Sequence, residues 1–547
     1  MSANIRASAE AASLSHQQAG TAASDALRRG ETSLGIELGS STIKACLIGP
    51  DFDIIATSSH AWENQFVDGS WTYSLESVWA GIQSCTATLL AAIEDVHGVR
   101  PHRFGAIGVS AMMHGYLAFD AAGELLVPFR TWRNTNTVAA AAELSRELDF
   151  NIPLRWSAAH LYQAVLDDEP HVPRIARITT LAGYVHWKLT GSWVLGVGDA
   201  SGVFPVDPAT TTYDDDRLTR FERLVSRRQP ELDVRKVLPE VLPAGAQAGR
   251  LTDAGCALLD PTDTLQPGVP FAPPEGDAGT GMVATNSIAP HTGNVSAGTS
   301  IFAMVVLDQN LRRVHEEVDI VATPVGQPVA MVHCNNGASE FDAWVRVFAD
   351  FATAAGTPLD DAAAFAACLD AALDGEPDGG GLLAYNYLAG EPVTGLPEGR
   401  PLVARTPASR LTLANFMRTQ VYSVFGTLSL GLRTLAEEGV RVESMLAHGG
   451  MFRTAGVAQR FLAAALDTPV TVRPTAGQGG AWGCAILADY VRTGARTSLH
   501  DHLQHGFSGE AIDTVVPDAA DRAGFEHFLA RYEAGLAVER AAVNALS

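Results

Sequence analysis

The sequence predicts an α/β protein with two lobes of related design. The ordered chain opens near Leu34 with a strand, a turn rich in Gly, Ser and Thr, and a second strand, and residues 293–308 repeat this unit. Residues 442–466 add a strand, a glycine turn and a helix, which is how α/β folds form a ligand crevice at the carboxyl end of a strand. A chain of 547 residues also exceeds what one hydrophobic core supports, so two or more domains are expected.

The composition is that of an ordinary globular protein, and it argues against two classes of partner. Hydrophobic residues make up 47% of the chain and charged residues 18%, and the formal net charge is −23. No Lys/Arg-rich block and no apolar run of about 18 residues occurs, so neither a nucleic acid nor a membrane is expected as a partner. The six cysteines are scattered without a CxxC pair, which indicates reduced thiols in a cytoplasmic protein.

Residues 273–305 contain the strongest candidate for catalysis. Asp277 is flanked by Gly276, Ala278 and Gly279, which have little side-chain bulk. A substrate hydroxyl can therefore come within hydrogen-bond reach of the carboxylate, which is the geometry that a general base requires. A surface loop in which Gly and Pro serve only turn geometry is the alternative interpretation.

Two turns are candidates for binding phosphate, because each is rich in backbone N–H groups and hydroxyls. The first contains Gly39, Ser40, Ser41 and Thr42 and is followed by Lys44, and the second contains Gly298, Thr299 and Ser300. A plain β-hairpin is the alternative for the first turn. A P-loop is excluded, because it requires a Gly-Lys pair and none of the three lysines follows a glycine. The motif GTGMVA at 279–284 follows a Pro-rich loop instead of a strand, so dinucleotide binding is not expected either.

Three further positions have both a functional and a structural interpretation. His114 closes a buried strand and can hydrogen-bond a polyol, or it can be a core histidine. Trp132 can pack an apolar face against a sugar, or it can belong to the core. Gly449 and Gly450, before Met451, allow close approach of a flat base to the backbone, or they form only a tight turn.

Taken together, these motifs resemble the FGGY carbohydrate kinases within the actin and sugar-kinase superfamily. The resemblance covers about residues 33–495 and rests on GIELGSSTIKA, MMHG, GDAGTG, GNVSAGTS and HGGMFRT, which occur in the family's order. It implies an α/β fold of two ribonuclease-H-like lobes of the actin/hexokinase superfamily, with the active site in the cleft between them.

The resemblance also implies roles for individual residues. Asp277 is expected to be the catalytic base and to contact the substrate. Further substrate contacts are expected from Met113, His114, Trp132 and Asn134. Nucleotide contacts are expected from Gly39, Ser40, Ser41, Thr42, Lys44, Gly298, Thr299, Ser300, Gly449, Gly450 and Met451. Glu37 stands where the family usually has an Asp that organises Mg²⁺ through water, and a longer carboxylate can still reach a hydrated ion.

Four segments are expected along the chain: a disordered tail at 1–32, a sugar-binding N-terminal lobe at 33–288, a nucleotide-binding C-terminal lobe at 289–495, and a C-terminal helical extension at 496–547. The expected activity is phosphorylation of a ketopentose, D-xylulose or L-ribulose, at its terminal hydroxyl, with ATP and Mg²⁺. Two alternatives stay open, namely a non-catalytic regulator of actin-like fold that binds ATP and sugar, and a glycerol-type polyol kinase. The expected partners are the sugar and ATP, and a homodimer is left open.

Overall fold

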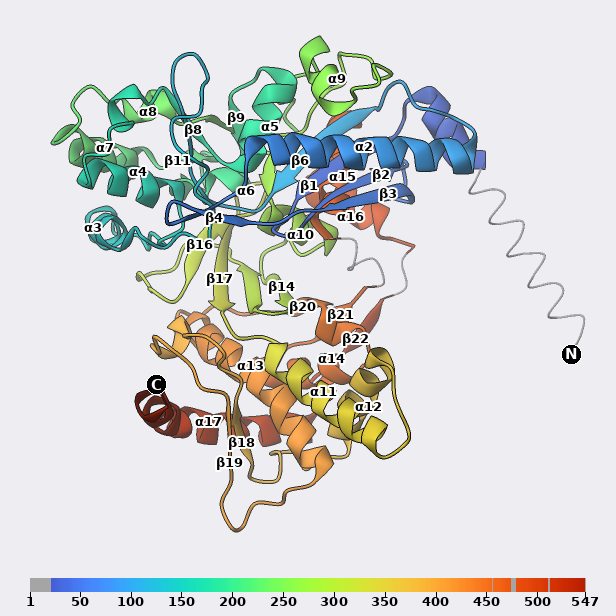
Figure 1. The fold of residues 1–547 in the computed structure, drawn as a ribbon, viewed down its shortest axis with the longest axis vertical. Helices are drawn as coiled ribbons and strands as arrows, with labels where there is room; N and C mark the ends of the chain where they lie inside the picture. Colours follow the sequence, from blue (N-terminus) through green and yellow to red (C-terminus); the bar gives the residue numbers. More distant parts are fainter. Residues whose placement is uncertain (1–20, 455, 474–478, 510–511, 547) are drawn as a thin grey trace, which may run out of the picture. The chain divides into compact units, whose positions relative to one another are not determined.

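The computed structural model describes residues 21–454, 456–473, 479–509 and 512–546. Within them the chain forms two compact units, each built on its own β-sheet (Figure 1). Unit 1 comprises the described residues up to 286 together with 321–327 and 479–509, and unit 2 comprises the other described residues. The expected α/β class is therefore confirmed.

The main sheet of unit 1 has five strands in the order β13-β6-β1-β2-β3. Strands β1 (Ser33–Leu38), β2 (Thr42–Ile48) and β3 (Ile54–Ala61) form an antiparallel meander, which confirms the predicted strand, turn and second strand. Strands β6 (Ala106–Ala111) and β13 (Glu275–Gly276) extend the sheet on the other side of β1, and both run parallel to it. The carboxyl ends of β1, β6 and β13 therefore meet at one edge of the sheet.

Outside this sheet, unit 1 is mainly helical, and α2 packs on β2 and β3 (Figure 1). Its helices are α2 (Leu75–His97), α3 (Val138–Leu148), α4 (Ser157–Leu166), α5 (Leu181–Thr190), α6 (Val197–Ala200), α7 (Asp215–Ser226), α8 (Val234–Val237), α9 (Asp253–Leu259), α10 (Asp277–Ala284), α15 (Gly479–Arg492) and α16 (Leu499–Gly506). Its short strands are β4 (Gln65–Val67), β5 (Ser70–Thr72), β7 (Leu117–Phe119), β8 (Arg177–Thr179), β9 (Val194–Gly196), β10 (Val206–Asp207), β11 (Thr212–Tyr213) and β12 (Glu240–Leu242).

Helix α15 packs very closely on the unit 1 sheet, although it comes from the far end of the sequence. A Cβ atom added to Gly35 of β1 would lie 2.1 Å from the carbonyl oxygen of Ala481. Only a residue without a side chain permits this contact between a strand and a helix. Glu37 lies two residues along the same strand and so faces the same helix. The close contact thus places the Glu37 carboxylate at the start of α15.

Unit 2 repeats the design of unit 1 in a sheet of the order β16-β17-β15-β14-β20-β21-β22. Strands β14 (Thr292–Ala297), β15 (Ile301–Val306) and β17 (Pro328–Cys334) form the antiparallel meander. Strands β20 (Ser444–Gly449) and β21 (Val470–Val472) follow on the other side of β14 and run parallel to it. The order β17-β15-β14-β20-β21 corresponds to β3-β2-β1-β6-β13, so the predicted relationship between the two lobes is confirmed.

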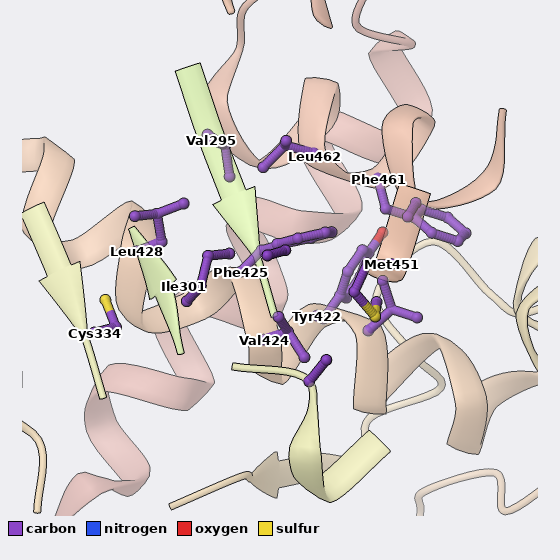
Figure 2. Close-up of a cluster of buried hydrophobic side chains, with 14 of the residues drawn as sticks. Val295, Ile301, Cys334, Tyr422, Val424, Phe425, Leu428, Met451, Phe461 and Leu462 are labelled. Carbon is purple, nitrogen blue, oxygen red and sulfur yellow. The ribbon is translucent and has the colours of Figure 1, made fainter. Parts of the chain in front are cut away.

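The core of unit 2 lies between this sheet and the long helix α13 (Leu413–Glu437). Figure 2 shows Phe425 and Leu428 of α13 beside Val295 and Ile301 of the sheet, all four fully buried. The other elements are α11 (Ser339–Ala354), α12 (Asp361–Leu373), α14 (Val457–Leu466), α17 (Ala519–Ala545), the 3-10 turns η2 (Pro392–Thr394) and η3 (Gly450–Phe452), and strands β16 (Asp319–Ala322), β18 (Leu383–Tyr385), β19 (Leu402–Ala404) and β22 (Asp513–Val515).

The structure differs from the predicted segments at three places. Residues 21–29 are helical with Leu27 buried, where the disordered tail was expected, while 1–20 lie outside the described residues. Helix α15 falls within the predicted C-terminal lobe, 289–495, but belongs to unit 1 because it packs on β1. The predicted helical extension contains, besides α16 and α17, strand β22, which pairs with β21. Each difference arises from a contact between segments far apart in the sequence.

Two expectations from composition can be compared with the described residues. All six cysteines are buried and none is in a disulfide, as expected for reduced thiols. Within the described ranges, none of the helices combines the length and the apolar character needed to cross a bilayer.

Candidate active site

Most of the predicted site residues of unit 1 gather at the carboxyl edge of its sheet. Leu38 and Gly276, the last residues of β1 and β13, both pair in register with Ala111, the last residue of β6. The first phosphate turn follows β1, Met113 and His114 follow β6, and Asp277 follows β13. Parallel pairing therefore brings together three motifs that are widely separated in the sequence.

Asp277 is the first residue of α10, and backbone N–H groups fix one of its oxygens. The N–H of Met113 donates to Oδ1 at 3.1 Å, and the N–H of Ala278 donates to the same atom at 2.9 Å. Both hydrogen bonds end on Oδ1, which leaves Oδ2 as the oxygen that can take a proton from a substrate. The side chain is only partly buried, so a ligand can reach it.

The small residues beside Asp277 serve internal packing, which differs from the predicted role. A Cβ atom on Gly276 would lie 2.8 Å from Cγ of Met113, and one on Gly279 would lie 3.3 Å from Oε2 of Glu275. The space left by these glycines is therefore occupied by other side chains of unit 1.

The electrostatic surroundings of Asp277 suit a general base that works near neutral pH. Burial, and after it the nearby charge of Glu37, together raise the pKa of Asp277 to about 6, while the N–H groups of Met113 and Ala278 oppose the rise. A base whose pKa lies close to the working pH is both ionised and basic enough to accept a proton.

A buried pair of carboxyl groups, Glu275 and Asp199, lies near Asp277, and the sequence gives no indication of it. Glu275 accepts the N–H of Asp199 at 2.9 Å and that of Gly198 at 3.3 Å. Asp199 accepts the hydroxyl of Thr180. Burial raises the pKa of Glu275 to about 8, with a further contribution from Asp199, and burial raises the pKa of Asp199 to about 7. The pair therefore holds a proton at neutral pH, because two buried carboxylates this close cannot both ionise.

His114 is a buried, neutral side chain with one ring nitrogen fixed. It is 4% exposed, its ring stacks on Trp156 at 6.1 Å, and Nδ1 lies 3.3 Å from the carbonyl oxygen of Gly202. A carbonyl oxygen only accepts, so Nδ1 carries the proton and Nε2 is an acceptor. Burial holds the pKa of His114 well below its usual range, with a contribution from Arg155. The imidazole can therefore accept a hydrogen bond from a hydroxyl.

Trp132 and Asn134, the other predicted sugar contacts, occupy different environments. Trp132 is 37% exposed, and its indole N–H donates to Oγ of Ser40 at 3.2 Å, so it lies against the first phosphate turn. Asn134 is buried, with its amide bonded to the backbone of Trp71 and Thr131. Its amide oxygen and nitrogen thus already have protein partners, and this favours a structural role for Asn134.

Glu37 and Lys44 face each other on neighbouring strands, close to the start of α15. They pair in register between β1 and β2, and the Glu37 carboxylate accepts the N–H of Ala481 at 3.2 Å. Burial raises the pKa of Glu37, while Lys44 and the N–H groups of Ala481 and Gly480 oppose the rise. A Cβ atom on Gly480 would lie 2.4 Å from Oε1 of Glu37. The Glu37 side chain, which is longer than the Asp usual in the family, therefore occupies the space that a side chain at position 480 would need.

The predicted nucleotide residues of unit 2 meet at the corresponding edge of its sheet. Ala297, the last residue of β14, pairs in register with Gly449, the last of β20, so the turn 298–300 lies beside 449–451. Gly449 has a φ of 108°, and a Cβ atom there would lie 2.2 Å from the carbonyl oxygen of Ala297. A Cβ atom added to Gly450 would meet no atom within 4 Å. The side chain of Met451, by contrast, is fully buried in the unit 2 core (Figure 2), so only its backbone is available to a ligand.

A segment that the sequence did not indicate supports the second turn. The N–H groups of Gly337 and Ala338 donate to the carbonyl oxygens of Thr299 and Gly298, each at 2.8 Å. Asn386 in turn donates to the carbonyl oxygen of Gly337 at 2.8 Å. The residues around 337 have no motif that would predict this contact, since it depends on β17 pairing with β15.

Two family models match the chain. The N-terminal domain of the FGGY family of carbohydrate kinases matches residues 32–283, and the C-terminal domain of the same family matches residues 293–491. The chain belongs to the FGGY family of carbohydrate kinases. This membership confirms the resemblance inferred from the motifs.

Relatives with curated names are distant from this FGGY protein. The xylulose kinase of Escherichia coli K12 is 21% identical over 274 residues, which cover 49% of this chain and 52% of the relative. The chain matches about half the length of such curated relatives.

Solved structures with different names share the FGGY kinase fold. The xylulose kinase of Lactobacillus acidophilus has a TM-score of 0.75 at 16% identity, with 93% of this chain and 98% of that one covered. A gluconate kinase from Lactobacillus acidophilus has a TM-score of 0.74 at 15% identity, and the glycerol kinase of Plasmodium falciparum has one of 0.72 at 13% identity, each with the same coverage. These likenesses show the two-domain, actin/hexokinase-like fold expected from the resemblance.

The Glu37 and Asp277 carboxylates of this FGGY chain fit a magnesium ion that keeps most of its water ligands. They do not fit an ion whose ligands all come from the protein. Among the residues described, no group of three or more His, Cys, Asp or Glu side chains could hold a metal ion. Mg²⁺ usually keeps several waters and binds one or two carboxylates together with substrate phosphates. Glu37 and Asp277 lie close enough for Glu37 to raise the pKa of Asp277, and both carboxylates belong to unit 1.

We expect Glu37→Gln to raise the Mg²⁺ concentration that gives half-maximal activity. Gln keeps an oxygen that can accept the N–H of Ala481, but an amide orders metal-bound water less well than a carboxylate. Activity would be titrated with Mg²⁺ at saturating substrates. An unchanged titration would leave Glu37 with the structural role of holding the start of α15.

Proposed function

We propose that this FGGY protein is an ATP-dependent kinase that phosphorylates a ketopentose, D-xylulose or L-ribulose, at its terminal hydroxyl. The observation that carries this proposal is the geometry of Asp277. One oxygen is fixed by two N–H groups, the other is left for a proton, and the pKa is raised to about 6. A carboxylate in this state is suited to accept the proton of an attacking hydroxyl.

In this reaction Asp277 accepts the proton of the sugar hydroxyl as the hydroxyl oxygen attacks the γ-phosphorus, and the bond from that phosphorus to the bridging oxygen of ADP breaks. Phosphoryl transfer of this kind is catalysed mainly by positioning and by stabilising charge. The N–H groups and hydroxyls of the turns 39–42 and 298–300 would hold the phosphates. Magnesium, when bound, would neutralise charge on the β- and γ-phosphates.

The choice of a ketopentose rests on the segment after β6. Met113 and His114 resemble the sugar-contacting residues of xylulokinase-type members, and Nε2 of His114 is available as an acceptor for a sugar hydroxyl. The curated relative from Escherichia coli K12 is itself named xylulose kinase, which supports the same substrate class. Gluconate and glycerol are included as comparison substrates, because two solved structures of the same fold are named gluconate kinase and glycerol kinase.

An ADP-release assay with a panel of D-xylulose, L-ribulose, D-ribulose, gluconate and glycerol tests this proposal. We expect sugar-dependent ADP release, with the highest kcat/KM for a ketopentose. ADP release that no sugar increases, together with ATP binding, would favour the non-catalytic regulator. A preference for glycerol would favour the polyol kinase.

We expect Thr299→Val to raise the KM for ATP about tenfold and to leave the KM for the sugar unchanged. The substitution deletes one hydroxyl from the proposed phosphate turn and keeps the β-branched shape. Thr353→Val is a matched control, since Thr353 is also exposed in unit 2 and its hydroxyl only donates within α11. KM values for both substrates would be measured for each variant. A change confined to the sugar KM would assign the turn to the wrong ligand.

A further inference from the structure

In the first phosphate turn, the carbonyl oxygens of Gly39, Ser40 and Ser41 accept hydrogen bonds from two aromatic residues. The indole N–H of Trp62 donates to the carbonyl oxygen of Gly39 at 2.8 Å, and the backbone N–H of Trp62 donates to that of Ser41 at 3.1 Å. The hydroxyl of Tyr73 donates to the carbonyl oxygen of Ser40 at 2.5 Å. Three consecutive carbonyl groups of the turn are thus held by two side chains and one backbone group.

These bonds determine where the N–H groups of the turn point. In a planar trans peptide the C=O and N–H bonds point in opposite directions. A Gly39 carbonyl directed at Trp62 therefore directs the N–H of Ser40 away from it, and the Ser40 carbonyl directed at Tyr73 does the same for the N–H of Ser41. Ser40 and Ser41 are exposed, and in the described part of the chain no partner is found for their N–H groups. Consecutive N–H groups of this kind form a site for an anion.

Trp62 and Tyr73 form a rigid pair, which is why they can hold the turn in one conformation. Their rings stack with centroids 4.2 Å apart and an interplanar angle of 25°. Trp62 is 7% exposed and Tyr73 is 1% exposed. Burial raises the pKa of the Tyr73 phenol, so its hydroxyl stays protonated and remains a donor. Each residue directly follows a strand, Trp62 after β3 and Tyr73 after β5.

The second phosphate turn has the same arrangement with different donors. There the carbonyl oxygens of Gly298 and Thr299 accept the backbone N–H groups of Ala338 and Gly337. Both turns therefore have their carbonyl oxygens bonded to protein donors, and a bonded carbonyl oxygen is held away from an approaching phosphate. A plain hairpin turn does not need its carbonyl oxygens bonded in this way. Because two unrelated sets of donors bond the carbonyl oxygens of the two turns, we connect this feature with the binding of phosphate.

We propose that Trp62 and Tyr73 are positioning residues for the phosphates of ATP. They orient the N–H groups of Ser40 and Ser41 toward the nucleotide without contacting it. This inference rests on the proposed function, in which the turn 39–42 binds the phosphate chain.

Tyr73→Phe removes one hydroxyl and leaves the stacked ring, so it isolates the hydrogen bond to Ser40. We expect the KM for ATP to rise about tenfold, since the Ser40 peptide loses its fixed orientation, while the sugar KM changes less than twofold. The inhibition constant of adenosine, which has no phosphates, should not change. Trp62→Phe is expected to act in the same direction, because it removes the indole donor to Gly39.

Tyr184→Phe is the matched control. Tyr184 is also buried in unit 1, and its hydroxyl makes a hydrogen bond with the indole N–H of Trp79 at 3.0 Å, away from the turn. The melting temperatures of both variants would show any general loss of stability. The positioning role is wrong if Tyr73→Phe raises the KM for ATP no more than Tyr184→Phe does. It is also wrong if Tyr73→Phe weakens the binding of adenosine as much as the binding of ATP.

Direct binding separates this inference from the proposed function. If the wild-type protein phosphorylates no sugar, the proposed function fails, and ATP affinity is then measured by calorimetry for the wild type and for Tyr73→Phe. A tenfold weaker affinity in the variant would still support the orientation of the turn. Equal affinities, or no binding of ATP to the wild type, would overturn it.

Discussion

Asp277→Asn is expected to lower turnover by about 10²- to 10⁴-fold and to leave sugar binding nearly unchanged. Asn has the same size and keeps an oxygen that can accept the N–H groups of Met113 and Ala278, but it cannot take up a proton. The kcat and the sugar affinity of the variant would be measured separately. Activity within about threefold of the wild type would remove Asp277 from the mechanism.

The pH dependence of the wild type gives a second measurement of the same residue. Only the ionised carboxylate accepts a proton, so kcat/KM should fall as the pH decreases through about 6, where burial and Glu37 place the pKa of Asp277. This decrease should be absent in Asp277→Asn. The control is Asp260→Asn, since Asp260 is a buried residue of unit 1 that, like Asp277, accepts backbone N–H groups. It should lower stability without changing the pH profile.

His114→Ala is expected to weaken sugar binding by about 5- to 150-fold, because a buried polar partner lost from a site costs about 1–3 kcal/mol. Nucleotide affinity should change little. Ketopentoses should be affected more than glycerol, which presents fewer hydroxyls to the imidazole. The measurement is kcat/KM for D-xylulose, L-ribulose and glycerol, together with the melting temperature.

The burial of His114 makes a control necessary, because the loss of a stacked ring also lowers stability. His186→Ala is suitable, since His186 is fully buried in unit 1 and one ring nitrogen lies 2.8 Å from the carbonyl oxygen of Ala248. Both variants should lose stability, but only His114→Ala should change the ranking of substrates. An unaltered ranking would make His114 a core histidine and remove the main reason for preferring a ketopentose.

The sequence by itself determined the local elements and predicted which of them carry the candidate site residues. The runs on either side of the turns at 39–42 and 298–300 predicted the hairpins β1–β2 and β14–β15, and the pattern around Gly449 predicted a strand, a turn and a helix, which are β20, η3 and α14. These patterns are reliable because they arise from backbone geometry within one segment. Asp277 was predicted as the catalytic base from a carboxylate among small residues and from the resemblance carried by the order of the motifs.

Only the tertiary structure decided which groups surround those residues. The pKa of Asp277 depends on burial and on Glu37, the pair of Glu275 and Asp199 forms only where β13 meets α6, and the first turn is oriented by Trp62 and Tyr73. Burial and hydrogen bonding act between atoms a few ångströms apart, whereas these residues are separated by many positions in the chain. Parallel pairing of β1, β6 and β13 brings them together, and a pattern read along one segment does not contain that pairing.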